Sequence, residues 1–194
     1  MSQMDEMYRI NEAYLREINP IEHIKYRLKT PERIVEKVKK ETDDISVESI
    51  ENTISDIAGI RIVCSFLSDL EEIKDVLKNY LDLEIIKEKD YVNFPKENGY
   101  KGYHIIVNIP VPIGKEIEKV KVEIQVRTIA MDMWAIIERN LRPRNMTPEE
   151  RKMELLALAT IRDEIDQTME SIIEEAKRIK ESKYKSRNKT PITK

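Results

Sequence analysis

Residues 119–128 read KVKVEIQVRT, and along this stretch apolar and polar side chains alternate without a break. A period of two is typical of a β-strand, because successive side chains point to opposite faces of the sheet. The apolar face predicts contact with a core, and the other face carries Lys121, Glu123, Gln125 and Arg127. Acid, amide and base in one row suit a site for phosphates and a metal ion. An ordinary solvent-facing strand would alternate in the same way.

Residues 56–66, DIAGIRIVCSF, form a nearly continuous apolar run, which predicts a central strand covered on both faces. Arg61 within this run needs an anionic partner, because an unpaired buried charge is costly. Asp56 and Arg61 are five residues apart, so a regular strand would place them on opposite faces. Either Asp56 precedes the strand or Gly59 marks a β-bulge.

The remaining periodicity predicts a chain in which helices and strands are mixed. Helices are expected over 4–18, 21–41, 46–53, 68–81, from 129 onward and from 147 to about 182, and strands over 83–92 and 103–110. The strand–helix–strand order favours a parallel crossover, and 103–110 should pair antiparallel with 119–128. In the expected 21–41 helix, Lys29, Arg33 and Lys37 share one face, where a bound polyanion or solvent would relieve their repulsion.

Residues 147–150, TPEE, are a helix start with an N-cap Thr, a first-turn Pro and a capping-box Glu. The helix that follows carries a stripe close to a heptad seam: Ile161, Ile165, Met169, Ile172, Ala176 and Ile179. Such a seam must be buried on its own domain or on another subunit, and we favour another subunit. The expected organisation is a domain over 1–145, a helical oligomerisation region over 146–182 and a disordered basic tail over 183–194.

Composition narrows the functional classes. The chain has 194 residues and a net charge of -3, so a strongly basic nucleic-acid binder is not expected. One cysteine excludes an internal disulfide, and two histidines exclude most His-rich metal sites. No stretch has the length of apolar sequence that a membrane span needs, so we expect a cytoplasmic protein without a membrane partner.

The charged residues predict a nucleotide site. Asp56 and Glu123, at the ends of adjacent strands, can hold Mg²⁺, and nearby Lys and Arg side chains can hold phosphate oxygens. Tyr100, between glycines in the loop 93–102, would be exposed and could stack on a base. Taken singly, a turn aspartate, a rim tyrosine and a satisfied sheet histidine at His104 explain these residues equally well.

Together, the motifs resemble the synthetase domain of RelA/SpoT-type proteins, in particular the single-domain small alarmone synthetases. The segments that carry the resemblance are RLK (27–29), DIAGIR (56–61), PKENGY (95–100), His104, EIQVRT (123–128) and the stretch 130–134. They agree in order and spacing over about residues 20–140.

The resemblance implies an α/β (α+β) fold, a mixed β-sheet of about five strands flanked by helices. This is a nucleotidyltransferase-like synthetase fold, here with long C-terminal helices. It also implies a transferase, GTP pyrophosphokinase, which moves the β,γ-pyrophosphate of ATP to the 3′-hydroxyl of GTP or GDP and makes (p)ppGpp. Mg²⁺ is the implied cofactor, ATP and GTP/GDP are the partners, and a homo-oligomer, with a tetramer favoured, is expected.

Roles are carried over by matching positions. Asp56 and Glu123 would hold the metal, and Glu123 would orient or deprotonate the 3′-hydroxyl. The implied ATP-binding residues are Arg27, Lys29, Lys37 and Arg61. The implied acceptor-binding residues are Lys96, Asn98, Tyr100, His104, Gln125 and Arg127.

The chain departs from the family pattern in two places. Lys101-Gly102-Tyr103 replaces the usual residues between the loop tyrosine and the histidine, and Arg139 stands where a histidine is usual. These departures bear on acceptor specificity and turnover. Because the family's hydrolase domain needs histidines that this chain lacks, we expect no alarmone hydrolysis.

Two other functions remain open from the sequence. A toxin-like relative of the same fold would pyrophosphorylate adenosine nucleotides or a tRNA 3′ end, although the net charge makes nucleic acid an unlikely partner. A non-catalytic nucleotide-binding oligomer would not need both Asp56 and Glu123.

Overall fold

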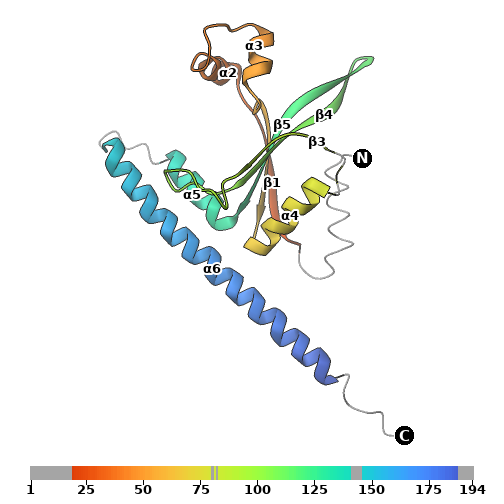
Figure 1. Ribbon diagram of the computed structural model, residues 1–194, viewed down its shortest axis with the longest axis vertical. Coiled ribbons are helices and arrows are strands. Elements are labelled where there is room, and N and C mark those ends of the chain that lie inside the picture. Colours follow the sequence, from red (N-terminus) through yellow and green to blue (C-terminus); the bar gives the residue numbers. More distant parts are fainter. Residues whose placement is uncertain (1–18, 80, 82, 141–145, 188–194) are drawn as a thin grey trace.

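The computed structural model describes residues 19–79, 81, 83–140 and 146–187 (Figure 1). The helix expected over 4–18 lies outside this part of the chain. The centre is one mixed sheet of five strands in the order β1-β2-β5-β4-β3, which confirms the predicted fold class. Its strands are β1 (Ile21–Leu28), β2 (Ala58–Cys64), β3 (Glu84–Asp90), β4 (Tyr103–Ile113) and β5 (Glu116–Thr128). The helices are α2 (Pro31–Val38), α3 (Val47–Thr53), α4 (Leu67–Asn79), α5 (Ile129–Asn140) and α6 (Pro148–Arg187).

The alternating stretch of residues 119–128 lies in β5, the middle strand of the sheet. β5 pairs in parallel with β2 and antiparallel with β4. Val122, Ile124 and Val126 are buried in the core, as the pattern predicts. β2 is therefore an inner strand beside the middle one, and Asp56 precedes it, which answers the question of the Asp56–Arg61 spacing.

The prediction of a helix over 21–41 is wrong for its first residues. Residues 21–28 form an edge strand that pairs antiparallel with β2, and only Pro31–Val38 is helical. Thr30 is extended, with φ -68° and ψ 153°, because the residue before a proline disfavours the helical region. Lys29 therefore lies before the helix, and the basic face expected for 29, 33 and 37 is not a continuous helix face.

α4 covers the apolar face of the sheet. Leu70, Ile73 and Leu77 of α4 pack in one cluster with Ile62, Tyr103, Ile105, Val107, Val122, Ile124 and Val126 of the strands. The chain leaves β2, forms α4 and enters β3 in the same direction, with β5 and β4 between these two strands. The predicted parallel crossover is thus confirmed, although its strands are not neighbours.

A second, smaller cluster joins α6 to the loop before β4. It contains Tyr100, Trp134, Leu155 and Ala159, and the Trp134 indole donates a hydrogen bond of 3.0 Å to the Leu155 carbonyl. The predicted capping box begins α6: the Glu150 amide donates to Thr147 Oγ1, and Glu150 accepts from the Thr147 amide. α6 continues to Arg187, five residues beyond the expected end, so the start of the expected tail is helical. α6 extends beyond the rest of the described fold (Figure 1). No described helix is long and apolar enough to cross a membrane.

Two glycines with positive φ give a test of the contact between α6 and the loop. At Gly99, φ is +86° and an added Cβ would lie 2.7 Å from the Ala159 Cβ, whereas at Gly114, φ is +65° and an added Cβ would meet nothing. Gly99→Ala should lower the free energy of unfolding by about 2–3 kcal/mol, and Gly114→Ala by about 1 kcal/mol, since only the first adds a clash to the backbone strain. Urea unfolding of both variants measures the difference; equal losses would show that the clash is relieved without cost.

Candidate functional site

The polar face of the sheet is built from residues that stand opposite one another on neighbouring strands. Arg61 of β2 is paired with Gln125 of β5, and Gln125 is paired with His104 of β4. Residues paired in this way share a face of the sheet. One step along the strands, Gly59 stands opposite both Arg27 and Glu123. Strand pairing alone therefore brings four separate sequence motifs onto one surface.

Asp56 lies at the entrance to β2, held by two lysines. Lys29 Nζ is 2.7 Å from Asp56 Oδ2, and Lys37 Nζ is 2.9 Å from Oδ1. Burial raises the pKa of Asp56, but the hydrogen bonds and charges of the two lysines outweigh it, so that the pKa is below its usual value. Lys29 and Lys37 do converge, as a shared anion site requires, but from the end of β1 and from α2.

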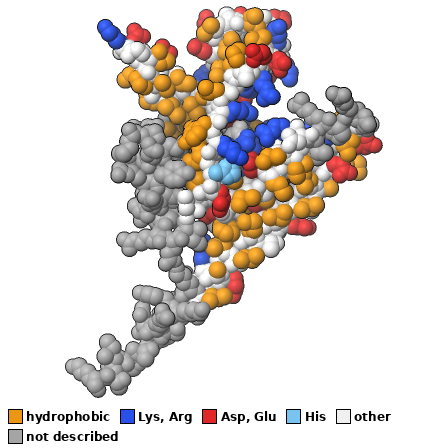
Figure 2. Space-filling model, turned by 180° about the vertical axis from the view of Figure 1, so that it is seen from behind, with side chains coloured by type: hydrophobic (Ala, Val, Ile, Leu, Met, Phe, Trp, Pro, Cys, Tyr) orange, Lys and Arg blue, Asp and Glu red, His pale blue; other side chains and the backbone are white. Residues whose placement is uncertain are grey.

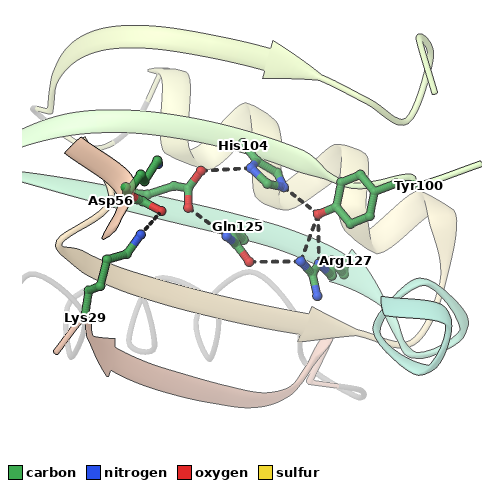
Figure 3. A network of polar contacts seen from close by, with 8 residues as sticks. Lys29, Asp56, Tyr100, His104, Gln125 and Arg127 are labelled. Carbon is green, nitrogen blue, oxygen red and sulfur yellow. Dashed lines mark hydrogen bonds and ion pairs between the residues drawn. The ribbon is translucent and has the colours of Figure 1, made fainter. Parts of the chain in front are cut away.

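Glu123 is nearly buried in the middle of the face. His104 Nδ1 lies 3.0 Å from its Oε1, and Gln125 Nε2 donates to its Oε2 at 2.7 Å (Figure 3). Burial and the charge of Asp56 raise the pKa of Glu123, whereas the hydrogen bonds from His104 and Gln125 lower it further than burial raises it. Glu123 is thus a carboxylate, and it lies close enough to Asp56 for the two charges to repel.

Tyr100 is buried, with 8% of its surface exposed, and not an exposed loop aromatic as the sequence predicted. Its hydroxyl lies 2.6 Å from His104 Nε2 and accepts hydrogen bonds from Arg127 Nε at 3.1 Å and Nη2 at 2.9 Å. Its ring makes edge contacts with Tyr91 and Trp134. Glycines on both sides do not expose the tyrosine, because α6 covers this loop.

These contacts assign the protons of the network in Figure 3. Since the Tyr100 oxygen accepts twice from Arg127, its own proton goes to His104 Nε2. His104 is then neutral, with its proton on Nδ1, and donates it to Glu123. Burial and the charges of Arg127 and Lys96 lower the pKa of His104, against the opposing effect of Glu123, which favours the same neutral form.

Asp132 completes the site and was not predicted from the sequence. Asp132 is buried in the first turn of α5, where its Oδ1 lies 3.0 Å from Arg127 Nη1 and 3.3 Å from Arg61 Nη1. The signal for it was the requirement that Arg61 have an anionic partner. The only acidic residue in the apolar stretch 129–137 is Asp132, so sequence reasoning could have named it.

Arginines line the hollow beside this network. A cavity of about 230 Å³ is bounded by Tyr100 and Gln125 and by Arg27, Arg61, Arg127, Arg139 and Arg151. A neighbouring cavity of about 200 Å³ shares Arg27, Arg61 and Arg139 and reaches Gly59 and Tyr26. Figure 2 shows Lys and Arg side chains gathered beside a histidine on this face. So many guanidinium groups around a small hollow favour phosphate as its ligand.

Two predicted acceptor residues lie at the edge of the network. Lys96 Nζ is 4.6 Å from the centre of the Tyr91 ring and 5.1 Å from that of Tyr100. Asn98 accepts a hydrogen bond from the Tyr100 amide and lines a more open cleft of about 670 Å³, which shares Glu138 and Arg151 with the arginine-lined cavity. Asn98 therefore shapes the loop, and it does not face the arginine-lined cavity.

Comparison with known proteins shows which family the sequence and the fold resemble. The family described as a region found in RelA / SpoT proteins matches residues 26–147. GTP pyrophosphokinase YwaC of Bacillus subtilis (strain 168) is 43% identical over 159 residues, which is 81% of this chain and 76% of YwaC. GTP pyrophosphokinase YjbM of the same strain is 35% identical over 156 residues, covering 79% of this chain and 72% of YjbM.

Solved structures agree with the sequence matches. The crystal structure of small alarmone synthetase 1 from Bacillus subtilis bound to its product pppGpp has a TM-score of 0.78 and 33% identity, covering 90% of this chain and 89% of that one. That of small alarmone synthetase 2 has a TM-score of 0.76 and 40% identity, covering 89% and 92%. The fold and the polar face define a synthetase domain of the kind seen in these structures. The chain belongs to the RelA/SpoT family, which confirms the resemblance found in its motifs.

The proton assignment predicts how stability depends on pH. Because folding lowers the pKa of His104 from the ordinary value of 6.5, protons bind more tightly to the unfolded chain. The free energy of unfolding should be unaffected by His104 above that value and should decrease as pH falls below it. Urea unfolding between pH 8 and 5 should show a shallower decrease in His104→Asn than in the wild type.

A second substitution at the same position gives the check. His104→Gln also lacks an ionisable ring and should show the same shallower decrease as His104→Asn. Equal slopes in the wild type and His104→Asn would contradict the assignment of a neutral His104.

Proposed function

We propose that this protein is a GTP pyrophosphokinase that makes (p)ppGpp and AMP from ATP and GTP or GDP. The observation that carries the proposal is a pair of neighbouring carboxylates, Asp56 and Glu123. Asp56 is held by a lysine pair, and Glu123 is hydrogen-bonded to Gln125, which lines the arginine-rich cavity. Membership of the RelA/SpoT family, with relatives named GTP pyrophosphokinase, supports the same activity. Transfer between phosphates needs positioning and charge neutralisation more than covalent help, and these residues offer both.

The reaction is a single displacement. Glu123 accepts the proton of the acceptor's 3′-hydroxyl, and the resulting oxygen forms a bond to the β-phosphorus of ATP. The bond between that phosphorus and the α,β-bridging oxygen breaks, so that AMP leaves with the bridging oxygen. Glu123 is suited to this role because its hydrogen bonds with His104 and Gln125 keep it ionised and fix its orientation.

Asp56 and Glu123 also fit the Mg²⁺ that the family implies. Within residues 19–79, 81, 83–140 and 146–187 no cluster of three or more His, Cys, Asp or Glu side chains could hold a metal. Mg²⁺ does not require one, since it is commonly held by one or two carboxylates with substrate phosphates and water. The mutual repulsion of the two carboxylates is what a divalent cation between them would relieve. Bound there, Mg²⁺ would neutralise charge on the transferred phosphates.

The remaining residues divide between the two nucleotides. Lys29 and Lys37 lie against Asp56 and would bind phosphates of ATP, with Arg27 and Arg61 in the adjoining cavities. Tyr100 would contact the guanine from the cavity wall, held through its hydroxyl by His104 and Arg127. Lys96 lies next to this ring and would meet acceptor phosphates, while Asn98 and Gln125 support the loop and Glu123 respectively. With nucleotides as both substrates, we place the activity in the cytoplasm.

Replacing the proposed base tests the function. Glu123→Gln keeps the size of the side chain but cannot accept the proton, so (p)ppGpp formation should fall by at least about a hundredfold. Chromatography of products from purified protein, ATP, Mg²⁺ and GDP or GTP measures this. Glu84→Gln, in the exposed part of β3, is the control and should remain fully active.

The same assay separates the other candidate functions. Product formed only with adenosine nucleotides or tRNA as acceptor would favour the toxin-like activity. An unchanged rate in Glu123→Gln would sink the proposed mechanism. Release of pyrophosphate from added (p)ppGpp would contradict the prediction that the chain has no hydrolase activity.

We further propose that α6 joins subunits into a homo-oligomer, with a tetramer favoured. Along α6, Ile161, Ile165, Ile172 and Ile179 are exposed, with between 37% and 64% of each side chain accessible. A helix with this much apolar surface along one stripe is stabilised when a partner covers the stripe.

A charge within the stripe tests this assembly. Ile172→Lys should shift the particle mass from oligomer to smaller species in light scattering, because a lysine cannot be buried in an apolar interface without cost. Glu174→Lys changes the same helix away from the stripe and should leave the mass unchanged. A wild-type protein that is monomeric at micromolar concentration would refute the assembly.

A further inference from the structure

The buried Arg162 of α6 has no part in the site described above, yet it contacts the loop that carries Tyr100. Arg162 is 1% exposed, and a fully buried arginine is rare unless it is paired. Its Nη1 donates a hydrogen bond of 2.5 Å to the Gly99 carbonyl, and its Nε and Nη2 donate to Asp163 Oδ1 at 3.0 and 2.7 Å. Its guanidinium carbon also lies 5.9 Å from the Trp134 ring.

Asp163 extends this contact to the other side of Tyr100. Its Oδ1 accepts from Lys101 Nζ at 2.9 Å as well as from Arg162. Two consecutive residues of α6 thus hold the residues that come directly before and after Tyr100 in the chain. The loop approaches α6 as closely as a glycine allows, since a Cβ at Gly99 would lie 2.7 Å from Ala159.

The loop has few other anchors in the described part of the chain. Its internal hydrogen bonds join Lys96 to Tyr100, Gly99 to Lys96 and Tyr100 to Asn98, which fix its turn. On the sheet side the loop is anchored at Gly102, whose carbonyl accepts a hydrogen bond of 3.0 Å from the Tyr91 amide just after β3. The Tyr100 hydroxyl is fixed by His104 and Arg127, and the residues directly before and after Tyr100 are held by α6 through Arg162 and Asp163. The orientation of the ring therefore requires both the sheet and α6.

We propose that Arg162 and Asp163 are positioning residues for the acceptor nucleotide, and that α6 completes the acceptor side of the site. They act through the backbone on either side of Tyr100, and neither touches the reacting atoms. This inference rests on the proposed function, in which Tyr100 meets the acceptor base. It predicts that loss of the clamp, defined as Arg162, Asp163 and Lys101, weakens binding of GDP or GTP and leaves ATP binding intact.

The test is a set of single variants with both substrates measured separately. Arg162→Met, Asp163→Asn and Lys101→Met should each raise KM for GDP by about tenfold or more, the scale of one lost charge-assisted hydrogen bond, with KM for ATP within about twofold of wild type. Because Lys101 and Asp163 share one ion pair, KM for GDP in the double variant Lys101→Met/Asp163→Asn should be no higher than in the more affected of the two single variants. Glu170→Ala removes a contact of α6 with the Ser68 amide, away from the loop, and should leave both KM values unchanged.

Asp163 and Lys101 are partly exposed, so their variants remain informative if Arg162→Met fails to fold. Equal rises in both KM values, or an unchanged acceptor KM in folded Asp163→Asn and Lys101→Met, would overturn the proposal. Equilibrium binding of GDP and of a non-hydrolysable ATP analogue to the same variants tests the positioning role of Arg162 and Asp163 without relying on the reaction. If the wild type bound GDP but formed no (p)ppGpp, the reaction assignment would fail, and a selective loss of GDP binding would still establish the clamp.

Discussion

The polar face of the sheet depends on one buried cation, the guanidinium of Arg127. A charge in this position is tolerated only if its donors are satisfied, because an unpaired buried charge costs several kcal/mol. Arg127 donates to the Tyr100 hydroxyl, to Gln125 Oε1 and to Asp132. Each of these contacts fixes a different part of the site. Tyr100 belongs to the loop 93–102, Gln125 orients Glu123, and Asp132 also neutralises Arg61.

One consequence of this arrangement is that the site residues share their partners. Glu123, His104, Tyr100 and Arg127 form a closed chain of hydrogen bonds with Gln125, so a change in one alters the hydrogen bonds available to the next. Effects of substitution within the chain should therefore not be additive. The lysine pair at Asp56 lies outside this chain and is held by its own ion pairs.

Much of the fold follows from local pattern. The period of two in residues 119–128 identified the middle strand, and the TPEE signature identified the first turn of α6. Residues 21–28 were misassigned because their apolar residues, Ile21, Ile24 and Leu28, are spaced as on a helix. Pairing with β2, a contact between residues thirty or more positions apart, decides that they form a strand, and no local pattern reports such a contact.

The sequence predicted which residues form the site better than it predicted how they are arranged. Motif order named Asp56, Glu123 and His104, and the structure brings them to one face of the sheet. Burial of Tyr100 was not predictable, because it depends on the position of α6. The sequence of α6 predicted an interface between subunits and did not indicate that the helix also covers the loop 93–102, which carries Tyr100. Asp132 could have been named as a partner for Arg61, because it is the only acid in the apolar stretch 129–137, whereas its second ion pair with Arg127 depends on the fold.

Gly59 has a further effect, although its backbone is that of an ordinary strand. It stands across from both Arg27 and Glu123, and it forms part of the wall of the smaller arginine-lined cavity. Any other residue at this position would place a side chain on the sheet between Arg27 and Glu123. Here the sheet offers bare peptide, so the backbone itself forms the floor of that cavity. A methyl group at this position would meet only backbone oxygens, at 3.7 and 3.9 Å, so the fold has room for it and its effect would be to make the cavity shallower. The missing side chain is itself a determinant of what the surface can hold.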